Sequence, residues 1–120
     1  MAFPYNVEAL EPLPPPYEIL ELQPGVPVDL EITGYRIGRI TIKPRFPGAP
    51  PEKTVAALRL FLTERCKPTF PHYYDITSGR LVSQLLPLLI GGYWRTHIIR
   101  VERDVPGPKA HFSIQLIPKP

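Results

Sequence analysis

The sequence predicts an α+β fold, in which an antiparallel sheet built from N- and C-terminal hairpins carries two central helices packed on one face. Apolar and polar residues alternate over residues 28–32 and again over residues 97–116, which is the period of a strand. Between them, residues 51–65 and 78–86 carry apolar side chains at helical spacing. Strands, then helices, then strands is the order typical of this class.

The first 16 residues form a separate predicted region. They end in Pro12-Leu13-Pro14-Pro15-Pro16, and proline fixes φ and removes an amide donor. We therefore expect residues 1–16 to form an extended, proline-rich, acidic arm, and residues 17–120 to form a single α+β domain.

The N-terminal part of the sheet follows this arm. A turn at residues 24–25 has the Pro-Gly order of a tight turn. A second tight turn at residues 33–34 would place Glu31 opposite Arg36, and Gly38 interrupts the later alternation as a predicted bulge. The predicted strands are residues 17–22, 28–32 and 35–43.

Two helices are predicted in the middle of the chain. The first begins at Pro51 or Glu52 and ends before Pro68. An aromatic loop over residues 69–76 follows, and Thr77 or Ser78 caps the second helix, which Pro87 ends or kinks. The apolar positions are Val55, Leu58, Phe61 and Leu62 in the first helix, and Leu81, Val82, Leu85 and Leu86 in the second.

A C-terminal hairpin centred on Pro106-Gly107 is the clearest strand pattern. This register pairs Glu102 with His111 and Arg100 with Ser113 on a polar face. The opposite, apolar face holds His97, Ile99, Val101, Val105, Ala110, Phe112, Ile114 and Leu116.

Charge is distributed unevenly along the chain. The first 34 residues carry six acidic side chains and no basic one, whereas residues 35–120 carry all 14 basic side chains and five acidic ones. This asymmetry predicts a polyanionic partner, an internal contact between the acidic and basic parts, or both.

The basic strands are interleaved with aromatic residues, a combination that suits nucleic acid because cations neutralise phosphates and rings stack on bases. The alternative is that these are ordinary solvated strand faces, paired with the acidic N-terminal strands. We expect phosphate contacts from Arg36, Arg39, Lys43, Arg45, Arg95 and Arg100, and stacking from Tyr35, Tyr93 and Trp94.

Catalytic and cofactor motifs are not evident. Cys66 lies six residues before His72, but the sequence indicates neither a stabilised thiolate nor a base in reach, so packing explains both better. The three histidines lack metal-ligand spacing, and residues 77–80 suit helix capping better than phosphate binding. We expect no enzyme activity, no cofactor and no metal.

The predicted function is therefore that of a small, non-enzymatic nucleic-acid-binding protein, directed at single strands or at the phosphate backbone. The alternative is a structural or assembly protein, such as a viral or mobile-element component or a subunit of a larger complex. Its arm and sheet edges would then make protein contacts or a homo-oligomer. A single cysteine and the lack of a long apolar run predict a cytoplasmic protein without membrane contact. Eighteen prolines favour heat adaptation.

Overall fold

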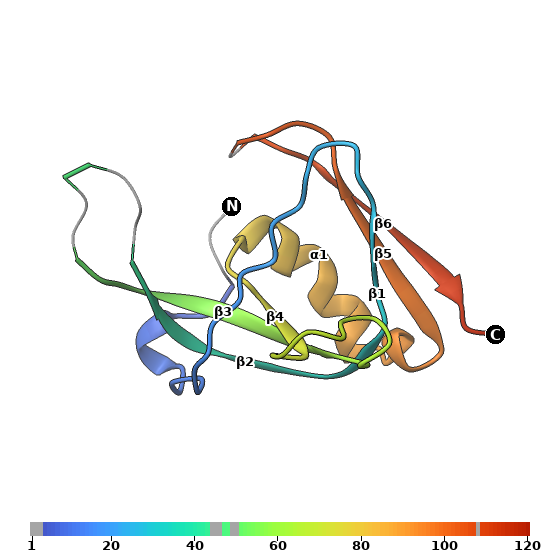
Figure 1. Ribbon diagram of the computed structural model, residues 1–120, viewed down its shortest axis with the longest axis horizontal. Coiled ribbons are helices and arrows are strands. Elements are labelled where there is room, and N and C mark those ends of the chain that lie inside the picture. The colour runs from blue at the N-terminus through green and yellow to red at the C-terminus, as the bar shows by residue number, and fades with distance from the viewer. Residues whose placement is uncertain (1–3, 44–46, 49–50, 108) are drawn as a thin grey trace.

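The computed structural model describes residues 4–43, 47–48, 51–107 and 109–120. These residues form two three-stranded antiparallel sheets, ordered β2–β3–β4 and β1–β5–β6, and one α-helix (Figure 1). The elements are β1 (Val28–Leu30), β2 (Ile32–Ile42), β3 (Lys53–Leu62), β4 (Tyr73–Ile76), α1 (Gly79–Ile90), β5 (His97–Arg103) and β6 (Phe112–Pro118), with short 3-10 helices η1 (Val7–Ala9) and η2 (Tyr93–Arg95). The mixed α/β class with antiparallel sheets is confirmed, but the predicted single sheet with two helices is wrong.

Helix α1 lies between the two sheets and packs on both (Figure 1). Its start was predicted correctly, since the Ser78 Oγ accepts a 3.3 Å hydrogen bond from the Leu81 amide. Pro87 lies inside the helix, which continues to Ile90. The shared core contains Leu81, Val82, Leu85, Leu86 and Leu89 of α1, Leu58 and Leu60 of β3, and Ile99 and Val101 of β5.

The predicted first helix is instead β3, the central strand of its sheet. Leu58 and Leu60 face α1, whereas Ala57 and Arg59 face the opposite side, and all four are buried. Burial on both faces removes the apolar–polar alternation that marks a strand, so the run resembles a buried helix. The predicted aromatic loop is also partly strand, because residues 73–76 form β4 beside β3.

A strap, which we define as residues 11–24, covers the face of the β2–β3–β4 sheet that is turned away from α1. The Leu13 amide donates to the Arg39 carbonyl on β2, and the Leu20 amide donates to the Asp75 carbonyl on β4, both at 2.9 Å. The strap therefore runs from one edge of the sheet to the other. Residues 17–22, predicted as a strand, instead make an isolated parallel bridge between Ile19 and Asp75, without a continuous ladder.

The strap is held at its middle by the buried side chain of Arg59, which is 2% exposed. The Arg59 Nε and Nη2 donate to the two carboxylate oxygens of Asp75, at 2.7 and 2.9 Å. Its Nη1 donates to the Pro14 carbonyl at 2.7 Å, and Nη2 also donates to the Pro16 carbonyl at 3.4 Å. Burial alone would lower the pKa of Arg59, but the hydrogen bond and charge of Asp75 hold it above its usual value.

The N-terminal turn at residues 33–34 is absent from the described fold. Strand β1 pairs with β5, and the chain passes directly into β2, so consecutive strands belong to different sheets. Glu31 consequently bonds Arg65 rather than lying opposite Arg36. The register irregularity lies between Ile32 and Gly34, whereas Gly38 pairs regularly with Ala57, so the bulge predicted at Gly38 is wrong.

The C-terminal hairpin is present with a register shifted by two residues. Glu102 lies opposite Ser113, and Arg100 lies opposite Gln115. The loop is longer than predicted because the Asp104 Oδ1 accepts hydrogen bonds from the Val105 and His111 amides and organises it. A shift of two preserves the faces, so the apolar face of β6 was predicted correctly.

We expect Asp75→Ala to destabilise the fold strongly. It would leave the Arg59 guanidinium buried without a counter-charge, which costs about 3–5 kcal/mol. Glu64→Ala, at a side chain that is 84% exposed, is the matched control and should cost less than about 0.5 kcal/mol. Urea denaturation measures both. A loss for Asp75→Ala no larger than that of the control would contradict the role of this ion pair.

We expect Gly38→Ala to displace the strap. An added Cβ at Gly38 would lie 2.6 Å from the Leu13 Cγ and 2.7 Å from the Glu11 carbonyl oxygen. At Gly34, in the same strand, the nearest atom would be 4.0 Å away, at Phe61. Thermal melting should therefore show a loss of about 1–3 kcal/mol for Gly38→Ala and little change for Gly34→Ala. Equal effects would show that Leu13 does not occupy the space above Gly38.

Candidate nucleic-acid interface

Most of the acidic side chains in the N-terminal part of the chain form ion pairs with basic side chains of the later part. Four of the six N-terminal acidic residues form ion pairs with cations of the later chain. The pairs are Glu11–Arg36 at 3.6 Å, Glu18–Lys67 at 2.9 Å, Asp29–Arg100 at 2.6 Å and Glu31–Arg65 at 2.6 Å. The acidic region therefore folds back on basic residues.

Two of the predicted phosphate contacts, Arg36 and Arg100, take part in these pairs. The Arg36 pair is long and solvated. Arg100 is held more firmly, because its Nε and Nη2 donate to the two carboxylate oxygens of Asp29, at 2.6 and 3.0 Å. That hydrogen bond lowers the pKa of Asp29 from its ordinary value of 3.8. A phosphate would have to displace Asp29 to reach Arg100.

The predicted stacking residues separate into partly buried rings, Tyr35 and Trp94, and an exposed ring, Tyr93. Tyr35 and Trp94 meet edge to face at 6.4 Å and pack against the main core. The Trp94 Nε1 donates to the Leu89 carbonyl, which ties this ring to the end of α1. Tyr93 is 49% exposed, and the Arg95 guanidinium lies 5.1 Å from the Trp94 ring centre. The short helix η2 therefore presents a predicted ring, Tyr93, and a predicted cation, Arg95, to solvent together.

The remaining predicted cations lie where the β2–β3 hairpin extends from the body. We call residues 39–43 and 53–56 the ribbon; in Figure 1 it leads away from α1 and the second sheet. Arg39 is on its first strand, Lys43 directly follows the end of that strand, and the exposed Lys53 begins its second strand. Arg45 lies outside the described residues. Among the described residues, Arg39, Lys43 and Lys53 make no ion pair.

Lys53 was missed because residues 51–65 were predicted as a helix. With the segment as a strand, Lys53 pairs with Ile42, and Thr54 pairs with Thr41. Side chains alternate across a strand, so Lys53 projects from the face opposite to Thr41 and Arg39. The clue in the sequence was the symmetric placement of Lys43 and Lys53 around a proline-rich loop. The ribbon therefore carries cations on both faces.

The base of the ribbon is fixed by the strap. Leu13, Ile40 and Ala57 form a second buried cluster, against which Ile42 and Val55 pack. The Thr41 and Thr54 hydroxyl oxygens, both on the exposed part, lie 3.4 Å apart. The hairpin thus has one anchored end and one solvated, polar end.

The side chains of Cys66 and His72 each make a polar contact with a backbone carbonyl group. The Cys66 Sγ donates to the Asp29 carbonyl at 3.3 Å, and the His72 Nδ1 lies 2.8 Å from the Lys67 carbonyl. The described residues contain no group of three or more His, Cys, Asp and Glu side chains placed to hold a metal ion. No helix in the described part of the chain is both long and apolar enough to span a membrane.

Comparison of the chain with protein-family models, curated proteins and solved structures gave no match.

The Asp29–Arg100 pair generates a pH prediction. Because the folded-state pKa of Asp29 is lowered, its contribution to stability is present above about pH 4 and is lost as the pH falls through the folded-state value. The exposure of the pair limits this contribution to less than about 1 kcal/mol. Denaturant titrations should show a flatter acid limb for Asp29→Asn and for Arg100→Gln than for the wild type. If the stability of the wild type and of both variants fell equally with decreasing pH, the proposed contribution of the Asp29–Arg100 pair would be contradicted.

Proposed function

We propose that this protein binds the phosphate backbone of nucleic acid through the ribbon. One observation carries the proposal: Arg39, Lys43 and Lys53 lie on one projecting hairpin without an ion pair among the described residues, while the acidic N-terminal region occupies Arg36, Arg65, Lys67 and Arg100 elsewhere. The acidic segment thus pairs with part of the basic body, whereas the three ribbon cations form no ion pair among the described residues. A local positive charge of this kind attracts polyanions.

The geometry of the ribbon favours binding to a nucleic-acid duplex over stacking against the bases of a single strand. A two-stranded β-ribbon fits the major groove, where phosphates line both sides. Arg39 and Lys53 project from opposite faces of the ribbon, so each can approach a different phosphate backbone. Tyr35 and Trp94 are packed against the core, so base stacking is no longer part of the proposal for these two residues.

We expect labelled duplex DNA or RNA to bind in fluorescence anisotropy titrations with a steep salt dependence. The double variant Lys43→Glu/Lys53→Glu should weaken binding at least tenfold at about 50 mM salt and reduce the magnitude of the log–log salt slope by about 2, because two phosphate contacts are lost. The control, Lys109→Glu/Lys119→Glu, has the same change in net charge away from the ribbon. Equal weakening by both pairs would show that net charge, not the ribbon, governs binding. Absence of binding by the wild type would contradict the proposed function.

The second candidate function, a structural or assembly protein, was predicted from the arm and the sheet edges. The strap is held against the protein's own sheets by hydrogen bonds to Arg39 and Asp75 and by a bridge between Pro24 and Arg103, so this part of the chain already has an intramolecular partner. The remaining support for this candidate is the exposed edge strand β6, whose backbone bonds only to β5 within the described residues.

A further inference from the structure

In the described part of the chain, three of the four sheet edges make hydrogen bonds with other segments of the chain. The strap bonds to Arg39 on the β2 edge and to Asp75 on the β4 edge. On the β1 edge, the Asp29 carbonyl accepts a hydrogen bond from the Cys66 thiol. Strand β6 is the remaining edge of the β1–β5–β6 sheet, and within the described residues its backbone bonds only to β5.

The backbone groups that β6 leaves open follow from its register. At the two ends of the hairpin, the Asp104 amide donates to the His111 carbonyl and the Lys119 amide donates to the Thr96 carbonyl. Bonding alternates along antiparallel strands, so the odd-numbered residues of β6 face β5 and the even-numbered ones face outward. The outward N–H and C=O groups belong to Phe112, Ile114 and Leu116.

This open edge has none of the usual protection against pairing. Natural edge strands are kept apart by charged side chains, inward-pointing charges, bulges or a covering segment. Strand β6 has seven residues, none of them charged, and it pairs with β5 in an unbroken register. Its only proline, Pro118, is at the very end. Such an edge is suited to accept another strand.

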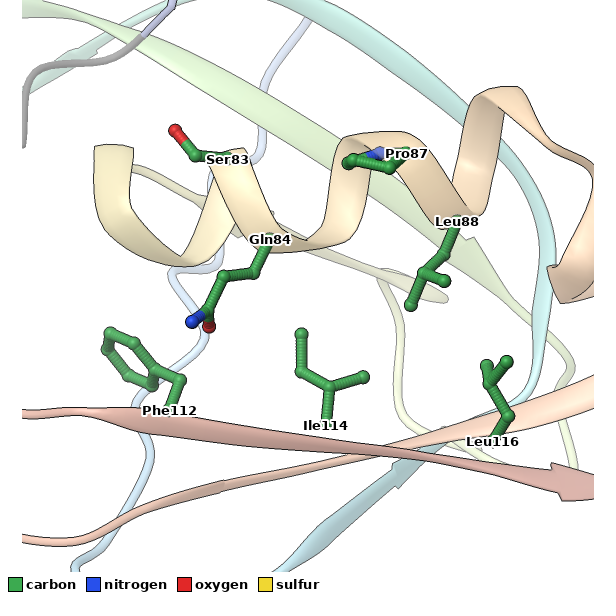
Figure 2. Close-up of a pocket in the computed structure, with 7 residues that line it drawn as sticks. All are labelled: Ser83, Gln84, Pro87, Leu88, Phe112, Ile114 and Leu116. Carbon is green, nitrogen blue, oxygen red and sulfur yellow. The ribbon is translucent and has the colours of Figure 1, made fainter.

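The side chains of the outward residues line a groove beside α1. Phe112, Ile114 and Leu116 point toward the helix, from which Gln84 and Leu88 point back (Figure 2). The groove has a volume of about 390 Å³ and is mainly apolar. Leu116 is 36% exposed, so this face is incompletely covered within one chain. A strand added at β6 would extend the sheet under the groove.

We propose that β6 pairs with β6 of a second copy of this chain, antiparallel and about a two-fold axis at Ile114. In that register Ile114 lies opposite Ile114 of the partner subunit, and Phe112 lies opposite the partner subunit's Leu116. Each outward-facing residue then meets an outward-facing residue, as backbone pairing requires. The two sheets become one continuous six-stranded sheet.

The occupant is a second copy because the edge complements itself. A two-fold axis perpendicular to the sheet keeps the apolar faces of both β6 strands on the α1 side, so the two grooves join. Apolar residues directly opposite each other on neighbouring strands form favourable pairs, and β6 offers such residues to a second copy of itself. Pro118 lacks an amide donor and ends the pairing at both sides. In Figure 1, β6 and the ribbon lie toward opposite sides of the molecule, so this pairing leaves both ribbons exposed.

Sedimentation equilibrium of the full chain, from nanomolar to high micromolar concentration, tests the proposal. The proposed dimer does not depend on nucleic-acid binding, so the measurement is carried out without nucleic acid. The expected mass is twice that of the chain, with dissociation on dilution. A monomer at all concentrations would overturn the proposal.

Charged substitutions at the axis test the register. Ile114→Lys places two ammonium groups opposite each other and should give monomers, as should Ile114→Glu. An equimolar mixture of the two should recover the twofold mass, because the opposite charges then meet. Val105→Lys, at an exposed residue of the β5–β6 turn, adds the same charge away from the edge and should remain a dimer.

Far-UV circular dichroism and thermal melting confirm that each variant is folded. Ile114 is partly buried, so Leu116→Lys, at a more exposed position of the same edge, provides a second disruption if Ile114→Lys does not fold. A folded Ile114→Lys or Leu116→Lys protein that keeps the mass of the wild-type dimer would overturn the β6 interface.

Discussion

The buried ion pair between Arg59 and Asp75 is the interaction on which the rest of this structure depends. One guanidinium binds the carboxylate on β4 and the carbonyl groups of Pro14 and Pro16 on the strap. A buried charge is tolerated only when its hydrogen bonds and counter-charge are present. The strap supplies the carbonyl groups, and the sheet supplies the carboxylate. The docked N-terminal segment and the β2–β3–β4 sheet therefore stabilise each other.

The consequences reach both the shape and the charge of the molecule. Leu13 on the strap packs on Ile40 and Ala57 and so fixes the base of the ribbon. The same docking brings Glu11 and Glu18 to Arg36 and Lys67. The acidic segment neutralises part of the basic body, whereas Arg39, Lys43 and Lys53 of the ribbon form no ion pair among the described residues. The proposed function follows from this partition, since charge that is paired inside the protein is not available to a phosphate.

The sequence predicted local features well and long-range ones poorly. The second helix, its Ser78 cap and the faces of the C-terminal hairpin depend on neighbours in sequence, and they are present. Strand β3 was predicted as a helix because α1 covers one of its faces and the strap covers the other. Gly38 was predicted as a bulge, whereas its function is to admit Leu13, 25 residues earlier. Of the residues in the proposed site, Arg39 and Lys43 were among those named from the sequence, whereas the partner of Arg100 and the packing of Trp94 against the core depend on tertiary contacts.

The most direct test of this account is an NMR titration of the isotope-labelled protein with a short duplex. The account predicts that backbone amide shifts change mainly at residues 41–43 and 53–55, on the ribbon, while the amides around Arg100 and Asp29 stay constant. Shift changes centred on β5 and η2, with a silent ribbon, would contradict it, because they would place the phosphate contacts on the surface that the acidic N-terminal region already occupies.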